Sequence, residues 1–144
     1  MKLVYLDTSV ALAHLLGEDV VPPKDLWAEN LVSSRLLHYE LWNRLNALKL
    51  GESYGSSAHE ILALVATLEL VSPIVERAGE GFPIPVRTLD ALHLASVLFL
   101  LEQGQRVTLA SYDRRLNKAA EALGIALFPL SKDGVAESGP DRPR

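Results

Sequence analysis

Four acidic residues lie at positions where their carboxylates could come together and bind a cation. Asp7 ends the apolar run KLVYL and Asp113 follows the run RVTLAS, while Glu40 and Asp90 lie within LLHYELWNRL and TLDALHLA. Carboxylates brought to about 4 Å repel by about 4 kcal/mol per pair at an effective dielectric constant of about 20, so a converging cluster must bind a cation or hold protons. Because the sequence has no cysteine, its oxygen ligands would favour Mg²⁺ or Mn²⁺ over zinc.

Each acid also has an ordinary structural explanation. Asp7 could cap the helix that follows it, and Asp90 and Asp113 could lie in first turns, where the helix dipole stabilises a carboxylate by about 0.3–1 kcal/mol. Glu40 could pair with Arg44 one turn later, for about 0.2–0.5 kcal/mol. Whether the acids meet at one place depends on the elements that carry them.

Strand-like and helix-like segments alternate along the chain. Short apolar runs predict strands at residues 3–6, 30–34, 68–73, 106–111 and 125–130. Helical periodicity predicts helices at residues 8–16, 35–50, from 56 through the run HEILALVATL, 74–78, 88–105 and 112–124, with a short helix opened by Pro22 and Pro23. Gly51 is expected to end the second of these helices.

Strands separated by helices imply right-handed crossovers and a mainly parallel sheet. The predicted fold is a three-layer α/β/α sandwich with a mainly parallel central sheet of four to five strands. In such sheets ligands bind beyond the carboxyl ends of the strands. Asp7 and Asp113 both follow strands, so they are expected at the same edge. Glu40 is expected to border the core, and Asp90 to lie in the first turn of the most apolar helix.

Composition limits the class of protein. The 144 residues are 49% hydrophobic and 22% charged, which predicts one globular domain over residues 1–130; residues 131–144, rich in Gly, Pro, Ser and charge, are expected to be disordered. Without cysteine, a signal-peptide pattern or a membrane-length apolar run, a cytoplasmic location is expected. A net charge of −4 disfavours a wholly basic nucleic-acid-binding surface. It still allows a basic rim drawn from Arg35, Arg44, Arg87, Arg114, Arg115 and Lys118.

Four short motifs resemble, in order, the acidic blocks of PIN-domain nucleases. They are YLDTS, LLHYELWNRL, TLDALHLA and LASYDRRL, and the resemblance covers residues 2–130. Within that family the chain is most similar to the compact VapC-type toxins of toxin–antitoxin pairs. The resemblance implies a PIN-like fold and a Mg²⁺- or Mn²⁺-dependent endoribonuclease. It also implies a homodimer that is inhibited by an antitoxin partner.

The resemblance further implies roles for individual residues. The acidic tetrad would be Asp7, Glu40, Asp90 and Asp113. Asp7 and Asp90 would be the principal metal ligands, and Asp113 and Glu40 would complete the cluster directly or through water. Ser9 and Ser111 match hydroxyl positions that orient the carboxylates, although the family more often has threonine where Ser111 stands.

Other residues near the acids could contact RNA. Flanking phosphates could be held by the basic residues that follow Asp113, namely Arg114, Arg115 and Lys118. An unpaired base could stack on Tyr39, Trp42 or Tyr112, although core packing is the expected role of these aromatic side chains. His93 lies on an apolar helix and is expected to be a buried, hydrogen-bonded residue.

Two other functions stay open from the sequence. A PIN-like domain without catalysis would serve as an RNA- or protein-binding module. A receiver-like phosphoacceptor domain also carries acids at this edge, but it should have adjacent acids after the first strand and a lysine after the last; here Asp7 stands alone and Ser131 precedes Lys132. The leucine-rich helices around Trp42 could form a dimer face or a groove for an antitoxin helix, or simply core.

Overall fold

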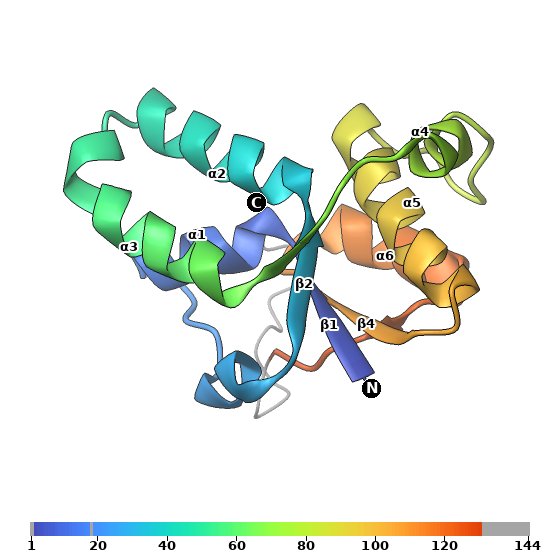
Figure 1. Ribbon diagram of the computed structural model, residues 1–144, viewed down its shortest axis with the longest axis horizontal. Coiled ribbons are helices and arrows are strands. Elements are labelled where there is room, and N and C mark those ends of the chain that lie inside the picture. Colours follow the sequence, from blue (N-terminus) through green and yellow to red (C-terminus); the bar gives the residue numbers. More distant parts are fainter. Residues whose placement is uncertain (1, 18, 131–144) are drawn as a thin grey trace.

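A five-stranded sheet forms the centre of the computed structural model, which describes residues 2–17 and 19–130 (Figure 1). The strand order is β3-β2-β1-β4-β5, and every neighbouring pair is parallel. The strands are β1 (Lys2–Leu6), β2 (Leu31–Ser34), β3 (Ala66–Leu68), β4 (Arg106–Ala110) and β5 (Ala126–Leu127). The predicted parallel sheet is thereby confirmed. The tail predicted to be disordered, residues 131–144, lies outside the described residues.

Helices cover both faces of the sheet, which confirms the predicted three-layer sandwich. Figure 1 shows the sheet nearly on edge, with one group of helices on its left and another on its right. The left-hand group is α1 (Thr8–Leu16), α2 (Arg35–Ala47) and α3 (Gly51–Leu64), and the right-hand group is α4 (Ser72–Ala78), α5 (Thr88–Glu102) and α6 (Arg114–Ala122). A short 3₁₀ helix, η1 (Lys24–Ala28), leads into β2. No helix within residues 2–17 and 19–130 is long and apolar enough to cross a membrane.

Side chains that alternate along β1 supply both halves of the core. Val4 and Leu6 pack in the cluster under α1, α2 and α3, whereas Tyr5 packs in the cluster under α5 and α6. Successive side chains of a strand point to opposite faces of its sheet. The central strand is therefore covered on both sides, as its apolar sequence requires.

The central strands end together at one edge of the sheet. Leu6 of β1 lies opposite Ala110 of β4, so Asp7 and Ser111 are the residues that directly follow the two strands. The hydroxyl of Ser33 in β2 donates to the carbonyl oxygen of Leu6 at 2.8 Å. These strand ends place the following residues side by side at the edge where α/β proteins bind their ligands.

The predicted position of the third strand is wrong. The strand is Ala66–Leu68 rather than residues 68–73, and it pairs with Val32, Ser33 and Ser34. Because β2 ends at Ser34, where α2 begins, the chain beyond Leu68 has no partner strand on that side. Residues 69–71 therefore leave the sheet, and α4 begins at Ser72, earlier than predicted.

The predicted role of Gly51 is also wrong, because this residue begins α3 rather than ending α2. Helix α2 ends at Ala47, and the left-handed residue of the connection is Lys49, with φ of 61°. A Cβ atom on Gly51 would lie 2.8 Å from Oδ1 of Asn46. The glycine therefore leaves room for the Asn46 side chain instead of making a left-handed turn, and this helix, Gly51–Leu64, begins and ends earlier than predicted.

The left-handed backbone at Lys49 predicts the effect of a glycine there. Lys49→Gly should raise the free energy of unfolding by about 0.5–1 kcal/mol, because a side chain at positive φ is strained and glycine is not. The same change at Lys118, an exposed residue inside α6, should lower it by about 0.5–1 kcal/mol. Urea denaturation of both variants measures the two effects. A loss of stability for Lys49→Gly equal to that of Lys118→Gly would contradict the strained connection.

Candidate active site

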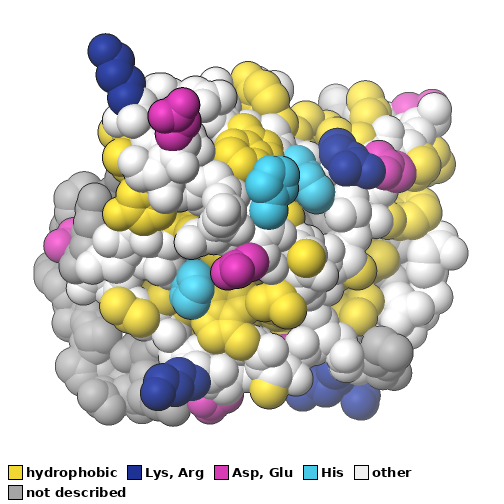
Figure 2. All heavy atoms as spheres, turned by 60° about the vertical axis from the view of Figure 1, so that its left-hand side comes forward, with side chains coloured by type: hydrophobic (Ala, Val, Ile, Leu, Met, Phe, Trp, Pro, Cys, Tyr) yellow, Lys and Arg dark blue, Asp and Glu magenta, His cyan; other side chains and the backbone are white. Residues whose placement is uncertain are grey.

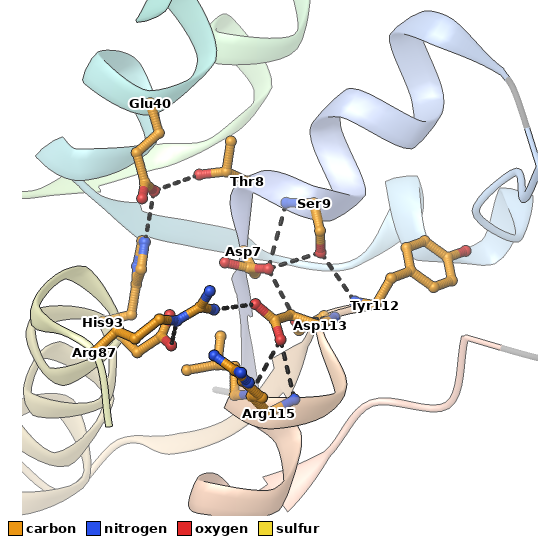
Figure 3. A network of polar contacts seen from close by, with 12 residues as sticks. Asp7, Thr8, Ser9, Glu40, Arg87, His93, Tyr112, Asp113 and Arg115 are labelled. Atoms are coloured by element: carbon orange, nitrogen blue, oxygen red, sulfur yellow. Dashed lines mark hydrogen bonds and ion pairs between the residues drawn. The ribbon is translucent and has the colours of Figure 1, made fainter. Parts of the chain in front are cut away.

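Asp7 is fixed at the carboxyl end of β1. Its backbone N–H donates to the carbonyl oxygen of Ala110 at 3.0 Å, which ties it to the end of β4. Its Oδ2 atom accepts hydrogen bonds from the N–H of Ser9 at 3.3 Å, the hydroxyl of Ser9 at 2.7 Å and the hydroxyl of Ser111 at 2.8 Å (Figure 3). The residue is only 6% exposed. Burial and three donors on one oxygen therefore hold this carboxylate in a single orientation.

Two serine hydroxyls join the strand ends to each other. The hydroxyl of Ser111 donates to Asp7 and accepts from the N–H of Asp113 at 2.9 Å. The hydroxyl of Ser9 also donates to Asp7 and accepts from the N–H of Tyr112 at 2.9 Å. Each hydroxyl thus uses its donor on the carboxylate and an acceptor lone pair on the backbone after β4. The two serines contact Asp7 in the way that an orienting role requires.

Asp113 uses its two carboxylate oxygens for different purposes. Oδ1 caps α6 by accepting the backbone N–H groups of Arg115 at 3.0 Å and Leu116 at 3.3 Å. Oδ2 accepts from Nη2 of Arg87 at 3.0 Å. The cap fixes the direction of the side chain, so Oδ2 is the oxygen that Asp113 presents to the other acids.

Arg87 joins the first turn of α5 to the start of α6. Its Nε donates to Oδ2 of Asp90 at 3.0 Å, while its Nη2 donates to Asp113, so one guanidinium bridges two acids. Figure 3 shows this side chain reaching from the α5 side toward Asp113. The side chain of Arg87 is 56% exposed, whereas those of Asp90 and Asp113 are 13% and 18% exposed. The bridge therefore has two nearly buried acceptors and a donor in contact with water.

Glu40 approaches from α2 and is held by two donors. Its Oε1 accepts the hydroxyl of Thr8 at 2.7 Å and Nε2 of His93 at 2.8 Å (Figure 3). Nδ1 of His93 in turn lies 2.8 Å from the hydroxyl of Tyr5, and both of these residues are buried. In the described part of the chain Glu40 is thus bonded across the core rather than to Arg44, the partner predicted from spacing.

The charges of this site shift several pKa values. Burial opposes the charge on His93, but Tyr5, Glu40 and Asp7 outweigh it and raise the pKa well above the ordinary 6.5. Burial likewise opposes the charge on Glu40, but His93, together with Thr8 and Arg87, lowers its pKa below the ordinary value. The lower pKa of the acid and the higher pKa of the base favour an ion pair at neutral pH.

Asp90 has the opposite shift to Glu40. Its pKa is raised mainly by burial; the ion pair with Arg87 offsets part of this effect, and the negative charges of Asp113 and Asp7 add to it. The negative charges of Asp7 and Asp113 thus act on Asp90 even though Arg87 lies between Asp90 and Asp113. A cation near Asp90 would relieve this repulsion.

The four predicted acids all lie at the carboxyl edge of the sheet. Asp7 and Asp113 are N-caps, Asp90 is in the first turn of α5, and Glu40 borders the core. Asp7, Asp90 and Asp113 therefore have the helix-terminal positions that would explain them structurally, and they also lie at the same edge as Glu40. A donor set made only of carboxylates suits the hard cations Mg²⁺ and Mn²⁺. However, within the described residues no three acidic or histidine side chains are arranged to hold an ion as they stand.

Arg87 and Thr8 are partners of the acids that the sequence analysis did not assign to the site. The sequence places Arg87 only among the possible rim charges, although its spacing of three residues before Asp90 is a helix-type ion-pair spacing. Thr8 directly follows Asp7 and had no distinguishing signal, because its partner Glu40 is distant in sequence. His93 was expected to be buried and hydrogen-bonded, and the structure confirms this.

The surroundings of the acids carry the other predicted contact residues. Arg114, Arg115 and Lys118 are exposed on α6. Exposed hydrophobic side chains also lie on α2 and α3, and Figure 2, turned toward this side, shows hydrophobic patches interrupted by polar and histidine side chains. A groove there is lined by His38, Tyr39, Trp42, Asn43 and Asn46. The leucines Leu37, Leu41 and Leu45 are buried core, so only the outer side of α2 is open to a partner.

The buried pair of Glu40 and His93 predicts a pH-dependent stability. Because the pKa of His93 is raised in the folded state, protonated His93 stabilises the fold. This contribution is complete below about pH 6.5 and is lost as the pH rises through the folded-state pKa. The lowered pKa of Glu40 contributes above about pH 4.5 and is lost as the pH falls through its folded-state value. The stability difference between wild type and His93→Gln, measured by urea denaturation, should be largest between these values and shrink at higher pH.

Ser96→Ala is the matched control for this measurement. Ser96 is buried on the same helix, but it does not titrate and its hydroxyl donates only locally, to the carbonyl oxygen of Leu92 at 2.8 Å. Its stability cost should not change from about pH 5 to about pH 9. A cost of His93→Gln that is equally constant over that range would contradict the ion pair.

Known proteins resemble this chain over most of its length. The family model described as "PIN domain" matches residues 4–122. Ribonuclease VapC46 of Mycobacterium tuberculosis is 33% identical over 138 residues, which cover 91% of this chain and 100% of that protein. Ribonuclease VapC35 of the same organism is 29% identical over 134 residues, covering 87% of this chain and 95% of that protein.

The fold matches a solved structure as well. The crystal structure of VapC20 from Mycobacterium tuberculosis, described as a sarcin-ricin loop cleaving toxin, has a TM-score of 0.62 to this chain and covers 81% of it and 94% of its own chain. At 20% identity this likeness concerns the fold alone. The family match spans the segment that carries all four acids. By sequence and by fold, this chain belongs to the PIN-domain family.

Proposed function

We propose that this protein is a metal-dependent endoribonuclease that hydrolyses RNA phosphodiester bonds. One observation carries the proposal: four carboxylates, from four separate elements of a PIN domain, lie at the edge where parallel sheets bind ligands. The sequence relatives named above are ribonucleases. The proposal makes Asp7, Glu40, Asp90 and Asp113 the catalytic residues.

Asp7, Asp90 and Asp113 are the residues that would hold the Mg²⁺ or Mn²⁺ ion. A divalent cation bound by these carboxylates would screen the phosphodiester charge and lower the pKa of the attacking water. The chain supplies rigid positioning: the hydroxyls of Ser9 and Ser111 hold Asp7, and the cap of α6 holds Asp113. Little reorganisation of Asp7 is then needed when the substrate binds.

Glu40 is suited to orient the attacking water molecule or to accept its proton. One of its oxygens, Oε1, is occupied by Thr8 and His93, so the side chain is fixed while its lowered pKa keeps it ionised near neutral pH. An ionised carboxylate can orient water or accept its proton. Asp113 is the other candidate for this role, through Oδ2. The exposed Arg114, Arg115 and Lys118 would hold flanking phosphates on the outer side of α6.

The biological role that fits this activity is the toxin of a type II toxin–antitoxin pair. The relatives VapC46 and VapC35 and the structural neighbour VapC20 carry the VapC name, and the last is described as a toxin. The proposal includes RNA as substrate, a cognate antitoxin, a homodimer and a cytoplasmic location. The exposed hydrophobic side chains of α2 and α3, including Tyr39 and Leu64, each 59% exposed, offer a surface for protein contacts.

A catalytically inactive PIN-like binding module is the second candidate. The arrangement that favours it is the bridge from Arg87 to Asp90 and Asp113, because the chain itself already offsets part of the charge of these acids without an ion. Family membership removes the basis for the receiver-like alternative.

Cleavage of RNA by matched variants tests the proposal. With Mg²⁺ or Mn²⁺ present, wild type should cut labelled structured or single-stranded RNAs and EDTA should stop the reaction. Asp7→Asn and Asp90→Asn should reduce the rate by about a hundredfold or more, because each removes a carboxylate charge from the site. Asp19→Asn makes the same chemical change at an exposed position and should cut like wild type. Wild type that binds RNA without cutting it under any of these conditions would support the binding module instead.

A further inference from the structure

The guanidinium of Arg87 donates to one oxygen of each of two aspartates that would hold the metal ion, Asp90 and Asp113. Asp113 commits Oδ1 to the backbone N–H groups of Arg115 and Leu116, so Oδ2 is its outward oxygen. Arg87 takes that oxygen, and it takes Oδ2 of Asp90 as well, each at 3.0 Å. A Mg²⁺ ion binds its oxygens at about 2.0–2.1 Å. An ion on Oδ2 of Asp113 would therefore share that oxygen with the guanidinium or replace it, unless the helix cap on Oδ1 opens.

An ion and the guanidinium would also repel each other. A dication bound to the same two carboxylates would lie within a few ångströms of the Arg87 charge, and like charges that close repel by several times the thermal energy. The electrostatics of the site agree with this competition. Asp90 is destabilised as an anion by burial and by Asp113 and Asp7, and Arg87 is the group that offsets these effects. Arg87 thus supplies, in the protein alone, part of the positive charge that a divalent cation would bring.

Release of Arg87 from the acids is easy. Its side chain is 56% exposed and extends from the N-cap position of α5, so the guanidinium can turn into water without opening the core. Ion pairs of such exposed donors are weak compared with the coordination of a divalent cation by several carboxylates. The Arg87 ion pairs therefore offset part of the charge of Asp90 and Asp113, and a divalent cation can replace them.

We propose that Arg87 is the exchangeable internal cation of this site: it offsets part of the negative charge of Asp90 and Asp113 in the metal-free protein and is displaced when Mg²⁺ or Mn²⁺ binds them. The inference rests on the proposed function, because it needs the ion at these acids. It also explains why no described group of acids is preformed for a metal. Arg87 is thus a residue of the site that sets its apparent metal affinity.

Calorimetric titration of Mn²⁺ into the whole chain tests the exchange. Arg87→Gln should bind Mn²⁺ roughly two- to thirtyfold more tightly than wild type, since two ion pairs no longer compete. Arg115→Gln is the matched control, because it removes the same charge beside Asp113 while the hydrogen bond that Arg115 makes to Asp113 uses the backbone N–H. Its affinity should change clearly less. Arg87→Lys keeps the charge without the two-pronged geometry and should fall between wild type and Arg87→Gln.

Thermal unfolding provides a second measurement that does not depend on activity. In EDTA, Arg87→Gln should melt below wild type, and saturating Mn²⁺ should raise its melting temperature by more than it raises that of wild type. Equal or weaker Mn²⁺ affinity of Arg87→Gln relative to Arg115→Gln would overturn the exchange while leaving the metal site in place. Absence of Mn²⁺ binding to wild type would overturn both this inference and the proposed metal dependence. If Arg87→Gln does not fold, the Mn²⁺ affinity of Arg87→Lys is compared with that of wild type instead. Tighter binding by Arg87→Lys supports the exchange, and equal or weaker binding overturns it.

Discussion

Mutual repulsion of carboxylates is the constraint on which this site depends. Asp7, Asp90 and Asp113 lie at one edge of a parallel sheet, and the charges of Asp7 and Asp113 help to raise the pKa of Asp90. Each acid is therefore given compensation of its own. Asp7 receives hydroxyl and backbone donors, Asp113 receives the N-terminus of α6, and Asp90 shares the guanidinium of Arg87. The fold tolerates its acids because the elements that bring them together also supply these donors.

The compensation divides the site into two parts that differ in their exposure to solvent. On the inner side, the buried His93 links Glu40 to Tyr5, and Thr8 ties Glu40 to the start of α1. On the outer side, the largely exposed Arg87 holds the two remaining acids. A buried network keeps its geometry when ligands arrive, whereas an exposed arginine can be exchanged. Such a division would allow an ion to enter without disturbing the carboxylate that is suited to act on water.

The fold and the positions of the acids could be predicted from the sequence, because both follow from local patterns. Alternating strands and helices predicted the sandwich, and the strand ends predicted where Asp7 and Asp113 would meet. The misplaced third strand shows where local patterns fail: its limits are set by β2, which ends at Ser34. The pairing of Glu40 with His93 could not be predicted either, since it joins residues that are 53 apart in sequence. The position of a single carboxylate can be predicted from nearby residues, but its hydrogen-bond partners depend on the tertiary fold.

The most direct measurement is the crystal structure of the protein grown with Mn²⁺, with the ion located by its anomalous scattering. The account predicts an anomalous peak among the carboxylates of Asp7, Asp90 and Asp113, with Arg87 turned away from Asp90 and Asp113. It predicts the same contacts of Glu40 with Thr8 and His93 that are seen here. A Mn²⁺ ion bound elsewhere, with Arg87 still joining the two aspartates at saturating metal, would contradict it.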